Sequence, residues 1–153
     1  LSRHDYVTPR AIVKVLDAMR RSPWFATYRD ALPIAGVDGT IGNRMKGTPA
    51  AGNARAKTGT VDKARSLSGY VTSADGRLIM FSMLSNNFTV PSREVERVQD
   101  LLVTTLAGLA DTASTLNGPA ILIVGEAMAL AHAGEAACVG CSSVASSVAA
   151  ISR

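Results

Sequence analysis

Charged residues, aromatic residues and cysteines are all scarce in this 153-residue sequence, at 18%, 5% and two residues respectively. No run of about 18 or more apolar residues occurs, so we expect no membrane-spanning helix. The arginines and lysines are scattered, and few aromatic rings are present to stack on bases, so we expect no nucleic acid partner. The length and the 47% hydrophobic content allow one domain with a sizeable core.

Both cysteines, Cys138 and Cys141, lie near the C-terminal end as Cys-Val-Gly-Cys. This spacing is found in half of a zinc site and in redox pairs, but no second pair of cysteines or histidines accompanies it. His4 and His132 are isolated. We therefore interpret the cysteines as two small thiols, and we predict neither a metal nor another cofactor.

The positive charge is concentrated in one part of the sequence. Residues 1–112 hold 15 Lys and Arg against 10 Asp and Glu, a net charge of +5, whereas residues 113–153 carry −1. A modest positive excess suits an acidic partner, such as a peptide with carboxylates or an anionic polymer.

The most informative stretch runs from Arg55 to Thr60 and contains Lys57-Thr58-Gly59. Lys-Thr-Gly is one of three signatures of the penicillin-binding protein and β-lactamase superfamily, beside Ser-x-x-Lys and Ser-x-Asn. By itself it is a weak signal, and an incidental Lys-Thr-Gly in a hairpin is the alternative. Alternation along a strand allows the Thr58 and Thr60 hydroxyls to point to one face, while Gly59 permits close backbone approach.

The surrounding pattern predicts an α+β fold with an antiparallel sheet of at least three strands, over 54–60, 66–72 and 77–85. The turn 73–76 contains Asp-Gly, which suits a tight hairpin. The strand 77–85 is almost continuously apolar, so we expect helices to cover both of its faces.

Two main helices are predicted, over 9–21 and 92–109, with a short one over 24–32. Thr8 and Pro9 are a favourable helix start, and Ser92 is the expected cap of the last helix. The expected buried face of the first helix is Ile12, Val13, Val15, Leu16 and Met19. That of the last is Val95, Val98, Leu101, Leu102, Leu106 and Leu109.

The glycine-rich segment 34–53 is predicted to be a long loop with one helical turn after Asp38-Gly39, and we interpret it as a cleft wall because it leads into the Lys-Thr-Gly strand. Residues 113–153 are an Ala/Ser/Gly-rich tail of unassigned fold. We favour a tail that packs poorly and lies outside the family pattern, with a buried strand and turn over 119–130 as the alternative. No site is assigned to this tail.

Four blocks, 1–9, 32–40, 56–60 and 67–71, closely resemble one family in their order and spacing. They are similar to the C-terminal part of DacB-type D-alanyl-D-alanine carboxypeptidases, the low-molecular-mass class C penicillin-binding proteins. The resemblance covers about residues 1–112 and implies a fragment of a β-lactamase/transpeptidase-like fold. In such proteins Ser-x-x-Lys and Ser-x-Asn lie upstream, and neither has a convincing counterpart here.

The resemblance implies site residues. Lys57 would supply a fixed positive charge, and Thr58, Gly59 and Thr60 would bind the substrate, with hydroxyls on its carboxylate. The backbone N–H of Thr60 would be one oxyanion-hole donor, so Lys57 and Thr60 are the catalytic candidates. Arg3 would bind a second carboxylate, with a surface ion pair as the equal alternative.

The implied function is that of a serine-type D-Ala-D-Ala carboxypeptidase or endopeptidase acting on peptidoglycan stem peptides. In the full-length protein the partners would be these peptides and β-lactams, in the periplasm or another extracytoplasmic compartment. Since residue 1 is Leu within a motif, we expect an internal cut, and a fragment that is inactive alone because it lacks the nucleophile. The alternative is a non-catalytic module that binds peptidoglycan peptides.

Overall fold

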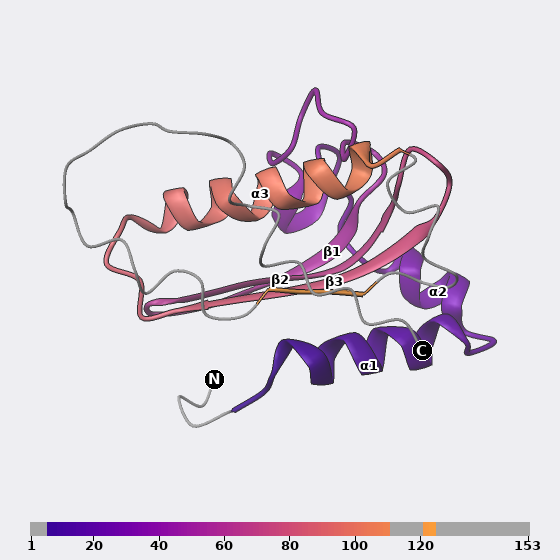
Figure 1. Cartoon of the computed structure of the whole chain (residues 1–153), viewed down its shortest axis with the longest axis horizontal. Coiled ribbons are helices and arrows are strands. Elements are labelled where there is room, and N and C mark those ends of the chain that lie inside the picture. Colours follow the sequence, from indigo (N-terminus) through magenta and orange to yellow (C-terminus); the bar gives the residue numbers. More distant parts are fainter. Residues whose placement is uncertain (1–5, 111–120, 125–153) are drawn as a thin grey trace.

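The computed structural model describes residues 6–110 and 121–124, which form a four-stranded sheet with helices on both faces (Figure 1). The elements in chain order are α1 (Pro9–Arg20), α2 (Phe25–Asp30), the 3₁₀ turn η1 (Gly39–Ile41), β1 (Arg55–Val61), β2 (Ala64–Thr72), β3 (Leu78–Asn86), α3 (Ser92–Gly108) and β4 (Ile121–Val124). The α+β class predicted from the sequence is confirmed. In the part of the chain that is described, no helix has the length and apolar character needed to cross a bilayer.

The sheet has the order β1-β2-β3-β4, in which β1, β2 and β3 are antiparallel neighbours and β4 runs parallel to β3. The three predicted strands are therefore correct to within two residues at each end. The short strand β4 falls inside the stretch 119–130, where a strand was the alternative to a poorly packed tail, so the sheet extends beyond residue 112. The division of the chain at that residue stays a prediction.

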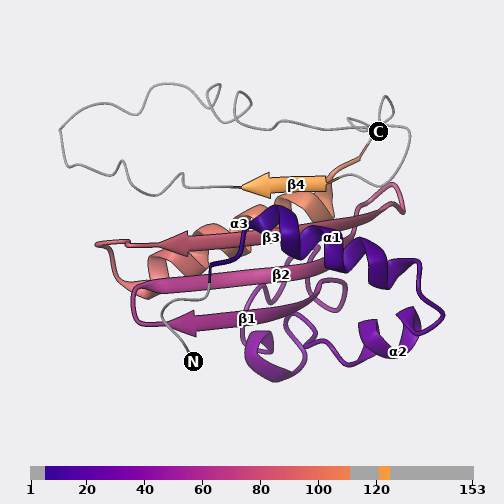
Figure 2. The same ribbon diagram turned by 90° about the horizontal axis from the view of Figure 1, so that it is seen from below.

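Helix α1 begins as the sequence predicts, because the Thr8 side chain accepts a hydrogen bond from the Ala11 N–H at 3.2 Å and Pro9 follows. Val13 and Leu16 are buried against the sheet, but Val15 is 58% exposed. Its assignment to the buried face was wrong, since two positions along an α-helix turn a side chain to nearly the opposite side. Figure 2 shows α1 over β2 and β3, with β1 at the edge of the sheet beyond β2.

The predicted face of α3 needs a larger correction. Val95 and Leu106 are buried, whereas Val98 is 40% and Leu101 is 65% exposed. The buried stripe includes Gln99 instead, because its amide finds hydrogen-bond partners inside the protein, as described below. Ser92 is also not the cap: Pro91 occupies that position, and the Ser92 hydroxyl accepts a hydrogen bond from Arg65 at 2.9 Å.

Segment 34–53 is packed into the core on the α3 side of the sheet, and it contains the predicted helical turn, η1 (Figure 1). It contributes buried Ala35, Ile41, Met45 and Ala50 to a cluster that includes Leu67, Phe81 and Val103. Apolar side chains at intervals in this glycine-rich segment thus fix it against β2, β3 and α3.

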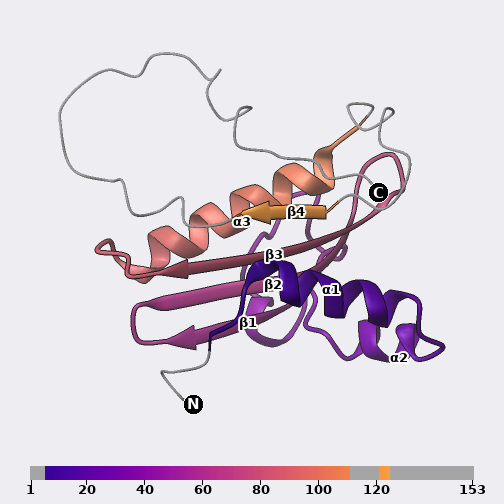
Figure 3. The same ribbon diagram turned by 60° about the horizontal axis from the view of Figure 1, so that its bottom comes forward.

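Strand β3 is covered on both faces, as predicted, and residues 79–83 are all buried. On its second face Met80 packs with Tyr70, Val13 and Leu16. Figure 3 shows α1 on this side of the sheet. The Tyr70 hydroxyl donates a 2.8 Å hydrogen bond to the Leu16 carbonyl. Burial raises the pKa of Tyr70 to about 12, with a smaller contribution from neighbouring Tyr28.

Gly69→Ala is expected to destabilise the fold by about 3 kcal/mol, because a well-packed site tolerates extra volume poorly. A Cβ at this position would overlap the Arg55 carbonyl oxygen and lie 2.6 Å from the Ala56 Cα, both on the neighbouring strand. Gly108→Ala is the matched control, since a Cβ there meets nothing within 4 Å and alanine favours the helix that Gly108 ends, so it should not lower stability. Urea unfolding measures both; equal stabilities would contradict the tight strand contact.

Tyr70 should make stability fall with rising pH above pH 10. The unfolded chain loses the tyrosine proton near its ordinary pKa of 10.0, while the folded chain keeps it up to about 12. Over that window the folded state binds more protons, so the free energy of unfolding decreases. Tyr70→Phe should remove this part of the slope in urea midpoints measured from about pH 9 to about pH 11. The control Tyr6→Phe, at a side chain 92% exposed, should leave the slope unchanged.

Candidate functional site

The outer edge of β1 presents backbone N–H groups of the Lys-Thr-Gly stretch. β2 lies on one side of β1, and on the other side the Ala56 N–H donates to the Pro33 carbonyl at 3.0 Å. Because successive N–H groups of a strand point to alternate sides, the N–H groups of Thr58 and Thr60 point outward, as that of Ala56 does. The predicted N–H donor of Thr60 thus lies on the edge of the sheet away from β2.

The pairing with β2 decides which face each side chain takes. Thr58 stands opposite Leu67, which is buried in the cluster under α3. Thr58 and Thr60 therefore share the α3 face, as alternation predicts. Lys57 stands opposite Ser68 on the other face, where it is exposed and its Nζ donates to the Thr58 carbonyl at 2.8 Å.

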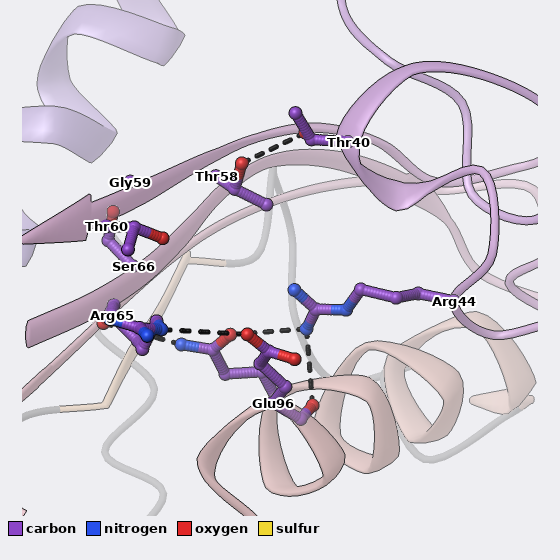
Figure 4. A pocket seen from close by; sticks show the side chains of 9 residues that line it. Thr40, Arg44, Thr58, Gly59, Thr60, Arg65, Ser66 and Glu96 are labelled. Atoms are coloured by element: carbon purple, nitrogen blue, oxygen red, sulfur yellow. Dashed lines mark hydrogen bonds and ion pairs between the residues drawn. The ribbon is translucent and has the colours of Figure 1, made fainter. Parts of the chain in front are cut away.

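A pocket of about 230 Å³ lies on the α3 face beside this stretch (Figure 4). It is bounded by β1, the start of β2, segment 34–53 and α3. Its lining consists mainly of hydroxyl, guanidinium and amide groups, from Thr40, Arg44, Thr58, Gly59, Thr60, Arg65, Ser66, Glu96 and Gln99. Such a lining suits a small polar ligand better than an apolar one.

Arg44 ties segment 34–53 to α3 across the pocket. Its guanidinium donates to Asp100 Oδ1 at 2.9 Å, to the Glu96 carbonyl at 3.2 Å and to Gln99 Oε1 at 3.2 Å. The Arg44 side chain is only 15% exposed, so these bonds are largely shielded from water. Next to it, Met45 has φ 59, an uncommon backbone conformation for a residue with a side chain. The segment is thus held in one defined path.

Arg65, at the start of β2, ties the strand side of the pocket to α3. It is paired with Thr60 across the hairpin, donates to Ser92 Oγ at 2.9 Å and lies 3.6 Å from Glu96 Oε1. Gln99 completes the link, since its amide donates to the Arg65 carbonyl at 3.5 Å while accepting from Arg44. Both arginines of the pocket are therefore already paired with acidic groups, Arg65 with Glu96 and Arg44 with Asp100.

The structure brings three of the predicted site residues, Thr58, Gly59 and Thr60, into one pocket. Lys57 is not among the lining residues, and Arg3 lies outside the described residues. Sequence reasoning missed Thr40, Arg44, Arg65, Ser66, Glu96 and Gln99. A usable signal existed for Arg65, because a tight hairpin after Val61 places it opposite Thr60.

The residue pattern Ser-x-Asn occurs once in the sequence, at Ser85-Asn86-Asn87. It lies at the end of β3, with β2 between it and the Lys-Thr-Gly strand, and after that motif in sequence. It therefore does not face Lys57 across a pocket. No serine in the sequence has a lysine three residues later, so Ser-x-x-Lys is absent.

Comparison with known proteins gives consistent matches. The profile of the D-Ala-D-Ala carboxypeptidase 3 (S13) family matches residues 1–109. The D-alanyl-D-alanine carboxypeptidase of Actinomadura sp. strain R39 is 40% identical over 72% of this chain, which covers 21% of that relative. Carboxypeptidase DacB of Mycolicibacterium smegmatis is 47% identical over 57% of the chain and 20% of the relative. The chain spans about a fifth of the length of these curated relatives.

A solved structure shows the same relationship. Penicillin binding protein 4 (dacB) from Haemophilus influenzae, in complex with a β-lactam, superimposes with a TM-score of 0.65 at 28% identity. The match covers 71% of this chain and 27% of that protein.

Arg44→Met should lower the free energy of unfolding by about 2 kcal/mol, because it leaves the Gln99 and Asp100 acceptors without their donor in a shielded site. The matched control is Arg97→Met. Arg97 is 71% exposed and is paired with Glu94, and both residues belong to α3. Exposed pairs contribute little, so the control should change stability by less than about 0.5 kcal/mol. Equal losses in the two variants, measured by urea unfolding, would show that Arg44 does not anchor the segment.

Proposed function

The chain belongs to the D-Ala-D-Ala carboxypeptidase 3 (S13) family, and we propose that it supplies the Lys-Thr-Gly wall of the cleft in which a serine-type peptidase of this family binds and cleaves peptidoglycan stem peptides. Membership confirms the resemblance inferred from the four sequence blocks, and the likeness to penicillin binding protein 4 confirms the fold class. The cleavage activity, its substrates and its compartment are part of the proposal.

The observation that carries this proposal is the combination of groups at the outer edge of β1. The Thr60 N–H points away from β2, and the hydroxyl-bearing side chains of Thr58 and Thr60 line the adjacent pocket. Acyl transfer requires an N–H donor for the developing oxyanion and donors for the terminal carboxylate of the peptide. Both kinds of donor are available within three consecutive residues.

Lys57 acts in this proposal as a fixed positive charge on the other face of the strand. Its ammonium is exposed and hydrogen-bonded to the Thr58 carbonyl, so it adjoins the carboxylate-binding residues without entering the core. A cation near the reacting groups stabilises charge that develops in the transition state. Arg3 remains a proposed contact for a second carboxylate of the stem peptide.

The nucleophile is proposed to come from a polypeptide part that carries Ser-x-x-Lys. Its serine would attack the carbonyl of the penultimate D-Ala, releasing the terminal D-Ala and forming an acyl-enzyme that water then hydrolyses. A β-lactam would acylate the same serine and remain attached. The 153 residues alone should therefore not become labelled by penicillin, and the assembled enzyme would act in an extracytoplasmic compartment.

The test is a chimera in which residues 1–109 replace the matching stretch of the Actinomadura carboxypeptidase. We expect labelled penicillin to acylate the chimera, and Lys57→Ala to lower the acylation rate about 100-fold or more through lost electrostatic stabilisation. Lys57→Arg should restore only part of the rate, because a planar guanidinium does not replace a compact ammonium.

Lys63→Ala is the matched control, since Lys63 is an exposed lysine in the β1–β2 turn. It should leave acylation unchanged, and all four proteins should melt at similar temperatures. Near-normal acylation of the Lys57→Ala chimera would reject the role of Lys57. A folded chimera that penicillin does not label would favour the non-catalytic peptide-binding module.

A further inference from the structure

Thr40 occupies a position in the pocket that the Lys-Thr-Gly motif does not explain. It belongs to η1 in segment 34–53, yet its hydroxyl accepts a hydrogen bond from the Thr58 hydroxyl at 2.9 Å (Figure 4). Among the described residues, the Thr40 hydroxyl donates to no protein acceptor, so its own proton is available toward the pocket.

The backbone around Thr40 is fixed by several independent contacts. The Asp38 carboxylate accepts from the Ile34 N–H at 2.7 Å, the Gly36 N–H donates to the Ile41 carbonyl at 3.1 Å, and the Ile41 side chain is fully buried. Gly39 has φ +58, and a Cβ there would lie 2.8 Å from Pro33 Cβ. These contacts hold the Thr40 hydroxyl within hydrogen-bonding distance of the Thr58 hydroxyl.

The Thr40 hydroxyl matters because the Thr58 hydroxyl has only one proton to donate. A hydroxyl has one proton, so a Thr58 hydroxyl that donates to Thr40 presents only lone pairs to an anion in the pocket. For Thr58 to donate to a carboxylate, its proton must turn toward the ligand, and its oxygen then accepts from Thr40. The Thr40 proton makes this exchange possible without leaving a polar atom unpaired.

Charge alone does not make the pocket select a carboxylate. Arg44 and Arg65 are both paired with acidic groups, at 2.8 Å and 3.6 Å from Asp100 and Glu96 respectively. Under the proposed function, a preference for an anion would therefore rest largely on hydrogen-bond donors, and chains of such bonds reinforce one another.

We propose that Thr40 is a positioning residue for carboxylate recognition: it holds the Thr58 hydroxyl in the free protein and donates to it when a C-terminal carboxylate occupies the pocket. The inference rests on the proposed function, because it takes a peptide with a free D-Ala carboxylate as the ligand. It assigns part of the specificity for that terminus to segment 34–53.

The experiment is an NMR titration of the 153-residue chain with two probes, an N-acetylated D-Ala-D-Ala dipeptide and the same dipeptide with an amidated C-terminus. The wild-type chain should bind the acid more tightly than the amide. Thr40→Val, which keeps the shape but removes the hydroxyl, should weaken binding of the acid about tenfold and leave the amide nearly unchanged. Thr40→Ser should restore the preference, and Thr105→Val, at an exposed threonine of α3, should not alter it.

The outcomes separate the two proposals. Wild-type preference for the acid that persists in Thr40→Val would overturn the role of Thr40 and leave the proposed function standing. If Thr40→Val weakened binding of both probes equally and Thr40→Ser did not restore it, the role of Thr40 in carboxylate recognition would be overturned in favour of a packing role. A wild-type chain with no preference for the acid would also overturn the role of Thr40, whereas the proposed function is tested separately by penicillin labelling of the chimera.

Discussion

The register between β1 and β2 is the constraint on which the rest of the site depends. It sets Thr58 against Leu67, and so directs the threonine hydroxyls to the α3 face and Lys57 to the other. A slip of one residue would exchange the two faces and move the hydroxyls out of the pocket. Gly69 helps to prevent that slip, because its lack of a side chain lets β2 approach Arg55 and Ala56 closely.

The second requirement is a rigid connection between the strand and its surroundings. The hydroxyls of a strand can bind a ligand selectively only if the opposing wall stays in place. Arg44 supplies that connection through three acceptors on α3, and the buried side chains of segment 34–53 add apolar contacts. Polar and apolar contacts therefore act together to keep Thr40 within hydrogen-bonding distance of Thr58.

The sequence predicted the elements better than it predicted the faces of the helices. The three antiparallel strands and α1 were predicted to within two residues, because alternating or continuous apolar runs and a Thr-Pro start are local signals. Val98 and Leu101 were wrongly assigned to the core, since apolarity alone does not reveal that buried Gln99 has partners on segment 34–53 and β2. Partners distant in sequence also explain why Ser92 was mistaken for a cap, when its hydroxyl accepts from Arg65.

The Lys-Thr-Gly motif predicts only the part of the site that lies on β1. Lys57, Thr58, Gly59 and Thr60 were predicted as site residues from the motif, the periodicity of a strand and the family resemblance, and the last three line the pocket. Thr40 was not, although it lies in one of the family-like blocks, because its role depends on a turn that returns to β1 after 18 residues. A motif thus identifies the donors on the strand, whereas the geometry of the opposing segment determines which of their protons are free to meet a ligand. In the proposed role of Thr40, selectivity for a carboxylate is a property of the paired hydroxyls and not of the Lys-Thr-Gly stretch alone.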